Sequence, residues 1–85
     1  MDNRGIDTDR IDDAVLALMY LTVHGADRTS GLARAWKSFD WAALGRLYEK
    51  DLIFDPVGKA KSVLLTEEGL RRSEALFYEL FSQRD

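Results

Sequence analysis

Several residue types that support chemistry are scarce in this chain. Its 85 residues include no cysteine and one histidine. The lack of cysteine excludes disulfides, thiolate nucleophiles and cysteine-ligated metals. His24 lacks the nucleophile and the orienting acid that catalysis needs, so we expect it to stabilise a helix end instead. Acidic residues between positions 7 and 13 lack the turn glycine and final glutamate of a calcium loop. We predict no enzyme activity, cofactor, metal site or small-molecule substrate.

Long apolar runs are also missing. The longest uncharged apolar-rich stretch, residues 14–23, is about half of a membrane span. Residues 1–10 are polar and acidic and do not resemble a signal peptide. We therefore expect a cytoplasmic protein with no membrane partner. A chain of this length forms one domain and buries only about 60–65% of its unfolded surface, so its stability is modest unless it associates.

The net charge of −3 is unevenly distributed along the chain. Residues 28–61 carry seven basic and four acidic side chains, whereas the segments on either side are acidic on balance. A basic segment favours contact with nucleic acid. A set of solvated side chains without a ligand accounts equally well for so small a surplus. Both interpretations stay open.

The N-terminal third predicts one helix. Residues 1–8 are expected to be a flexible lead-in to a single domain over residues 9–85. Any of the three polar residues at positions 7–9 can cap the helix, which we expect to run to about His24 and stop at Gly25. Apolar residues occupy nearly all of its faces. Such a helix is buried on more than one side, either centrally in the domain or against a second copy.

The middle of the chain predicts two further helices. Four apolar side chains between Leu32 and Phe39 follow the i, i+3, i+4, i+7 spacing of one helical stripe. Asp40 can cap the next helix, which continues through Lys50. Two helices with so short a connection form a helix-turn-helix.

After position 50 the pattern changes to strands and a final helix. Residues 52–54 and 62–65 predict two strands joined through a turn at 55–58. Thr66 can cap a last helix that continues to about Phe81.

These elements together resemble a known superfamily. Leu44-x-x-Leu47-x4-Leu52-Ile53, followed by Val63-Leu64-Leu65-Thr66-x-x-Gly69, resembles the winged helix-turn-helix pattern of MarR- and PadR-type regulators. The resemblance implies a small α+β winged helix-turn-helix domain, with three or four helices and a two-stranded β-hairpin wing. The usual glycine after the recognition helix is replaced by Asp51, which we expect to adopt a positive φ.

A narrower resemblance concerns two segments. The first is Arg34-Ala35-Trp36-Lys37-x-Phe39-Asp40-Trp41, and the second is Asp55-Pro56-x-Gly58-Lys59-Ala60-Lys61-Ser62. Both are similar to a small bacterial family catalogued as a domain of unknown function. That resemblance implies no activity.

DNA binding is the usual function of the superfamily. In this chain it would use the 40–50 helix and the 55–62 wing, in a weak or sequence-specific DNA-binding transcriptional regulator. The candidate DNA contacts are Arg34, Lys37, Arg46, Lys50, Lys59 and Lys61. Only Arg46 is suited to reading bases, through guanine, and the others would neutralise phosphates.

The competing hypothesis is a homodimeric protein-interaction or regulatory module, which we favour. Aromatic residues are enriched at interfaces, although we expect Trp36, Trp41 and Phe77 to lie in the core. A two-fold dimer through the first and last helices is predicted. Its candidate interface residues are Met19, Leu76, Tyr78 and Phe81. Sequence alone does not identify a protein partner.

Overall fold

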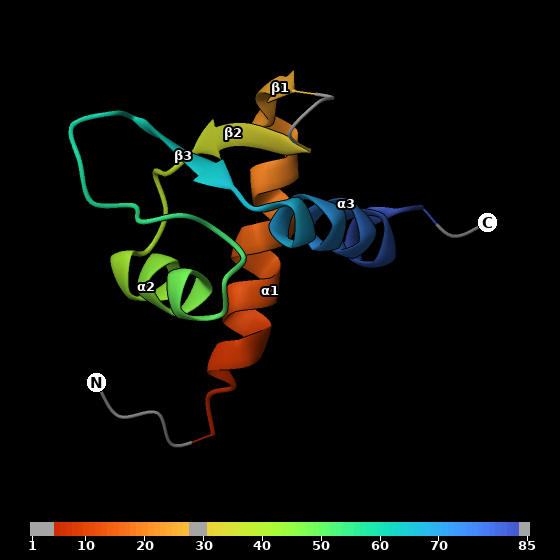
Figure 1. Ribbon diagram of the computed structural model, residues 1–85. Helices are drawn as coiled ribbons and strands as arrows, with labels where there is room; N and C mark the ends of the chain where they lie inside the picture. The colour runs from red at the N-terminus through yellow and green to blue at the C-terminus, as the bar shows by residue number, and fades with distance from the viewer. Residues whose placement is uncertain (1–4, 28–30, 84–85) are drawn as a thin grey trace.

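The computed structural model describes residues 5–27 and 31–83. The described residues form three α-helices, a short 3-10 helix and a small sheet (Figure 1). In chain order the elements are α1 (Thr8–Met19), the 3-10 helix η1 (Tyr20–Thr22), β1 (His24–Asp27), β2 (Leu32–Trp36), α2 (Trp41–Glu49), β3 (Ser62–Leu65) and α3 (Glu67–Phe81). The strands form one antiparallel sheet in the order β1-β2-β3. The fold is therefore α+β, as predicted.

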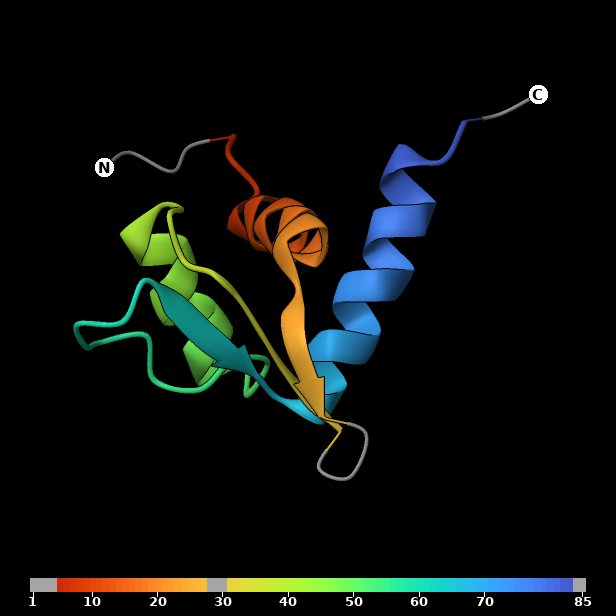
Figure 2. The ribbon, with the colours of Figure 1, turned by 90° about the horizontal axis from the view of Figure 1, so that it is seen from above.

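Helix α1 occupies the centre of the structure. It contacts α2 on one side and α3 on the other (Figures 1 and 2). Helices and sheet share one hydrophobic core. Core side chains with almost no exposed surface include Leu16, Met19, Leu44, Leu47, Ile53 and Leu65. The prediction that the first helix is buried on more than one face is confirmed, and the burial occurs within a single chain.

The start of α1 follows the predicted capping pattern. The Asp7 carboxylate accepts hydrogen bonds from the backbone N–H groups of Asp9 (3.0 Å) and Arg10 (3.3 Å). These bonds satisfy donors that would otherwise have no partner in the first turn. Of the expected flexible lead-in, residues 1–4 lie outside the described part of the chain.

The end of α1 differs from the prediction. The helix stops at Met19, η1 follows, and His24 already belongs to β1. The Thr22 hydroxyl donates to the Met19 carbonyl oxygen (2.9 Å) and accepts from the Trp36 backbone N–H (3.0 Å). This contact ties the helix end to β2. Gly25 does adopt a positive φ of 60°, but it does so inside a strand.

The helix predicted between Leu32 and Phe39 is wrong, because the first five of these residues form β2. Ala33 and Ala35 are buried and lie opposite β3 in the sheet. The same residues therefore satisfy a strand's two-residue alternation as well as a helical stripe, and pairing with β3 decides between them. The described residues contain only the second helix of the expected helix-turn-helix. A winged helix is thus not confirmed.

The helix predicted to begin after Asp40 is confirmed. The Asp40 carboxylate accepts from the Ala43 backbone N–H (3.1 Å) and caps α2. The chain leaves α2 through Asp51, whose φ of 61° is the left-handed conformation expected there. Asp51 thus performs the turn for which the superfamily pattern uses glycine.

The predicted hairpin is only partly formed. Residues 62–65 form the expected strand β3, but the expected strand at 52–54 is reduced to an isolated bridge between Ile53 and Leu65. A hydrogen bond from the Phe54 backbone N–H to the Leu64 carbonyl oxygen (2.9 Å) supports this bridge. The main pairing of β3 is with β2 and extends over four residue pairs. Sequence reasoning had assigned the residues of β2 to a helix.

Two tryptophans expected in the core are exposed. Trp36 retains 47% and Trp41 57% of its accessible surface, and Phe77 is half-buried. Helical spacing misplaced Trp36 because it lies on the outer face of β2. Trp41 is the first residue of α2 and is exposed at that end of the helix.

The first turn of α3 packs against the backbone of residues 51–52, which follow α2. The Thr66 hydroxyl oxygen accepts from the Gly69 backbone N–H (2.9 Å), and the hydroxyl lies 2.8 Å from the Asp51 carbonyl oxygen. A Cβ at Gly69 would lie 1.7 Å from the carbonyl oxygen of Leu52. The glycine of the Thr-x-x-Gly pattern is therefore required by close backbone packing.

Substitution of two helical glycines tests this packing. We expect Gly69→Ala to destabilise the fold by about 2 kcal/mol or more, because backbone must move to admit the methyl group. Gly45→Ala is the matched control, since nothing lies within 4 Å of its Cβ position. It should stabilise α2 by up to about 1 kcal/mol. Urea unfolding of both variants measures the difference, and equal effects would contradict the packing argument.

Asp51 provides a second test. We expect Asp51→Gly to stabilise the protein by roughly 0.5–1 kcal/mol, because glycine adopts the left-handed conformation without strain. Asp51→Ala, which retains the Cβ, should give no such gain. Thermal unfolding of the three proteins compares them, and a clearly lower melting temperature for Asp51→Gly would refute the expectation.

Candidate functional site

A buried carboxylate joins α1 to α2. Asp12 has no exposed surface. The Nε atom of Arg46 donates to both Asp12 oxygens at 2.8 and 2.9 Å, and a second guanidinium nitrogen lies 2.8 Å from Oδ1. Lys50 Nζ lies 2.9 Å from Asp12 Oδ2 and 2.9 Å from Asp9. Two cations from α2 thus neutralise one buried anion of α1.

The cluster sets the protonation state of its members. Burial raises the pKa of the Asp12 carboxyl, but hydrogen bonds from Arg46 and Lys50, together with their charges, outweigh burial and hold that pKa below its usual value. The hydrogen bond to Asp12 raises the pKa of Arg46. Asp12 therefore stays ionised at neutral pH.

Two of the predicted DNA contacts, Arg46 and Lys50, belong to this cluster. Arg46 and Lys50 lie together, as expected for one helix, but both side chains turn toward α1. Sequence reasoning missed this arrangement. A signal was present, because Asp12 shares the inward stripe of α1 with Val15, Leu16 and Met19. A charged residue on a buried stripe requires a partner of opposite charge.

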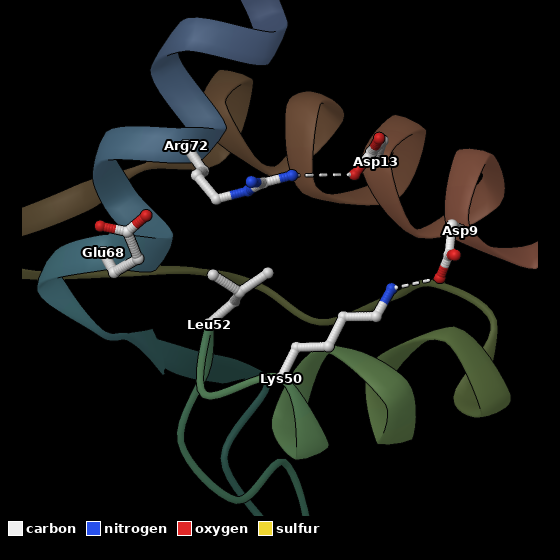
Figure 3. Close-up of a pocket in the computed structure, with 6 residues that line it drawn as sticks. All are labelled: Asp9, Asp13, Lys50, Leu52, Glu68 and Arg72. Atoms are coloured by element: carbon white, nitrogen blue, oxygen red, sulfur yellow. Dashed lines mark hydrogen bonds and ion pairs between the residues drawn. The ribbon is translucent and has the colours of Figure 1, made fainter.

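A cleft of about 500 Å³ opens beside the cluster, where α1, the end of α2 and the start of α3 meet. Figure 3 shows Lys50 paired with Asp9, and Arg72 paired with Asp13 at 3.4 Å. Its lining residues are Asp9, Asp13, Lys50, Leu52, Glu68 and Arg72. Glu68 also pairs with Arg71 outside the cleft lining. Since both lysine and arginine in the cleft already face carboxylates, the cleft is better suited to joining the helices than to binding a charged ligand.

The other four predicted DNA contacts lie around β2 and the 55–61 segment. Arg34 Nε donates to the Ser62 hydroxyl at 2.7 Å. Lys37 Nζ donates to the carbonyl oxygens of Pro56 (2.6 Å) and Gly58 (3.1 Å). Two further cations, Lys59 and Lys61, are exposed. Arg34 and Lys37 thus bond to the 56–62 segment, whereas Arg46 and Lys50 bond to α1.

The predicted dimer residues fall into two groups. Met19 is fully buried, so packing within one chain already accounts for it. Leu76 is half-buried, while Tyr78 and Phe81 are half-exposed near the end of α3. The last three lie on one helix, but Leu76 faces the groove between α1 and α3, whereas Tyr78 and Phe81 join the aromatic rings around Phe77.

Aromatic rings connect the end of α1 to this part of α3. The Tyr20 ring lies 5.3 Å from Phe77 and 6.0 Å from Tyr78, and Phe77 lies 5.6 Å from Phe81. Tyr20 also donates its hydroxyl hydrogen to Glu74 at 2.9 Å. That hydrogen bond, more than burial, raises the pKa of Tyr20 to about 12. The ring contacts and the hydrogen bond fix the orientation of α3 relative to the end of α1.

Residues 5–27 and 31–83 contain neither a metal-binding cluster nor a membrane-spanning helix. In these ranges no group of three or more His, Asp or Glu side chains is placed to hold a metal ion. No helix there is long and apolar enough to cross a membrane.

Residues 7–83 match a family described as a domain of unknown function (DUF6429). The chain belongs to this family. It is 59% identical over 78 residues to the uncharacterised protein y4hR of Sinorhizobium fredii (strain NBRC 101917 / NGR234), covering 92% of this chain and 97% of the relative. No solved structure matches the chain. The narrower of the two resemblances is thus confirmed, and neither match carries an activity.

Replacing the buried carboxylate tests the cluster. We expect Asp12→Asn to lower the free energy of unfolding by about 2–4 kcal/mol, because two partly buried cations lose their anion. The control is Asp13→Asn, whose partner Arg72 is exposed, and it should cost less than about 1 kcal/mol. Urea unfolding at neutral pH provides the comparison, and similar losses in both variants would contradict it.

The same cluster predicts a pH dependence. The folded-state pKa of Asp12 lies below the ordinary value of 3.8, so its stabilisation is present above that pH and is lost as pH falls through the folded-state pKa. We expect the stability difference between the unmodified protein and Asp12→Asn to shrink on acidification below about pH 4. A difference that stays constant into strong acid would refute this assignment.

Proposed function

We propose that this protein is a homodimeric protein-interaction or regulatory module that acts by binding and not by catalysis. The observation that carries the proposal is the exposure of apolar side chains near the end of α3. Gly69, Ser73, Leu76 and Leu80 follow one helical stripe, whose first two members are buried against the body. Leu80 has the same orientation but is half-exposed. The stripe thus continues beyond the buried contacts of Gly69 with Leu52 and of Ser73 with Leu16, and a second copy would cover the remainder.

The surface beside this stripe is suited to a two-fold contact. A groove of about 450 Å³ runs between α1 and α3. Its lining residues are Arg10, Asp13, Ala14, Leu76, Glu79 and Leu80. Apolar side chains form its middle, while Arg10 and Glu79 bring opposite charges from different helices. In a two-fold dimer the same patch meets itself, so Arg10 of one copy can face Glu79 of the other.

The environment of the only histidine also favours a binding role. His24 Nδ1 lies 2.7 Å from the Thr22 carbonyl oxygen, and its ring lies 4.9 Å from that of Trp36. Both contacts are structural. They differ from the nucleophile and acid partners that catalysis would require.

The alternative, a DNA-binding regulator reading DNA with α2, has less support. Arg46 is the best candidate base reader, but its guanidinium is committed to Asp12. Freeing it would leave a buried carboxylate without its principal partner, which is costly. DNA binding through α2 stays a prediction that competes with the interaction module.

Sedimentation equilibrium tests the dimer. We expect the unmodified protein to associate between low and high micromolar concentration. Leu80→Glu combined with Phe81→Glu should weaken association at least about tenfold, equivalent to 1.4 kcal/mol, because each dimer would bury four added charges. Both side chains are half-exposed in one chain, so the variant should still fold.

Ala75→Glu is the matched control. Ala75 is exposed on the side of α3 away from the stripe, so this added charge should leave association unchanged. A monomer throughout the concentration range would refute the proposal. Equal weakening by both variants would show that net charge, and not the α3 stripe, controls association.

A further inference from the structure

The outer face of the sheet carries an aromatic pair. His24 pairs with Arg34 across β1 and β2, and Trp36 lies two residues further along β2. The His24 and Trp36 rings lie 4.9 Å apart with an interplanar angle of 35°. Both side chains are exposed, whereas the alternate residues Ala33 and Ala35 are buried in the core. The sheet therefore presents flat ring surface to solvent, on the side opposite its core.

The backbone beneath these rings is held firmly. The Trp36 N–H donates to the Thr22 hydroxyl oxygen at 3.0 Å, and the His24 ring contacts the Thr22 carbonyl oxygen at 2.7 Å. One residue thus fixes both ring-bearing positions. A ring pair fixed in advance loses little conformational entropy when a flat group stacks on it.

A guanidinium accompanies the rings. Arg34 Nε donates to the Ser62 hydroxyl, and another guanidinium nitrogen donates to the Ser62 carbonyl oxygen at 3.1 Å. Arginine has five N–H donors, so others remain for a ligand. Neither acceptor is a carboxylate, and the positive charge of Arg34 is therefore not neutralised by this contact.

Further positive charge lies next to the rings. Ser62 pairs with Trp36 in the sheet, Lys61 immediately precedes Ser62, and Lys59 lies two residues before Lys61. The segments 31–40 and 54–65 contain four cations and two carboxylates, Asp40 and Asp55. Each of these carboxylates accepts from a nearby backbone N–H, Asp40 at the start of α2 and Asp55 within its own loop. The cations are in excess.

From this arrangement we propose that the outer sheet face binds single-stranded nucleic acid. Bases would stack on Trp36 and His24, while Arg34, Lys59 and Lys61 contact phosphates. Unpaired bases are required because paired bases are already stacked inside a duplex and have no free face to offer to the two rings. This surface is separate from the α3 stripe, so the proposal does not depend on dimerisation.

Fluorescence anisotropy with labelled oligo(dT) and oligo(rU) of about 12 nucleotides, within the usual site size of such proteins, is the test. At about 50 mM salt we expect binding that weakens steeply as salt increases. Trp36→Ala should weaken it about tenfold or more through lost stacking, and Trp36→Phe should restore most of the loss. Comparing the two oligomers distinguishes DNA from RNA as the preferred strand.

Trp41→Ala is the control for loss of an exposed tryptophan. Trp41 is somewhat more exposed than Trp36 and starts α2, so its removal should leave affinity unchanged. Lys59→Glu with Lys61→Glu should abolish binding at low salt, and circular dichroism should show that every variant is folded. The proposal is overturned if neither oligomer binds, if a duplex of equal length binds as tightly, or if Trp36→Ala and Trp41→Ala have equal effects.

Discussion

The ion cluster around Asp12 is the interaction on which the arrangement of the helices depends. It places a fully buried negative charge between α1 and α2, two helices that share an apolar core. Such a charge is tolerated only with good geometry and complete pairing, so α2 must present Arg46 and Lys50 to α1 in one orientation. The rotation of α2 about its axis is thereby fixed. The same requirement directs the side chains of Arg46 and Lys50 toward α1.

Local signals in the sequence predicted the helix boundaries well wherever a side chain caps the backbone. Asp40 and Thr66 begin α2 and α3 as expected, and the left-handed Asp51 was also predicted. These features depend on atoms within a few residues of each other. The strand β2 was missed because its evidence is not local. The apolar spacing of residues 32–36 fits both a helix and a strand. Only pairing with β3, some thirty residues later, stabilises the strand.

The candidate surfaces were also predictable only where local contacts determine them. The half-exposed end of α3 follows from helical spacing, so Tyr78 and Phe81 were placed correctly near the surface. Sequence reasoning grouped Arg34 and Lys37 with Arg46 as contacts for one ligand, whereas in the structure Arg34 and Lys37 bond to the 56–62 segment and Arg46 bonds to Asp12. Asp12 pairs with residues 34 and 38 positions later in the chain, and only the tertiary structure identifies these partners. The position of Asp12 on the apolar stripe of α1 did indicate that it needs a cation.

The bridge at the base of the 55–61 segment has a consequence for how this chain can vary. Residues 52–54 and 64–66 are joined by hydrogen bonds from Phe54 to Leu64 and from Thr66 to Leu52, so the segment leaves and re-enters the body at adjacent points. Its length is thereby uncoupled from the positions of α2 and α3. Doubling a flexible loop adds only about 0.6 kcal/mol of closure entropy. This makes the segment the natural place for inserted residues, in relatives or by design, while the helices around Asp12 stay unchanged.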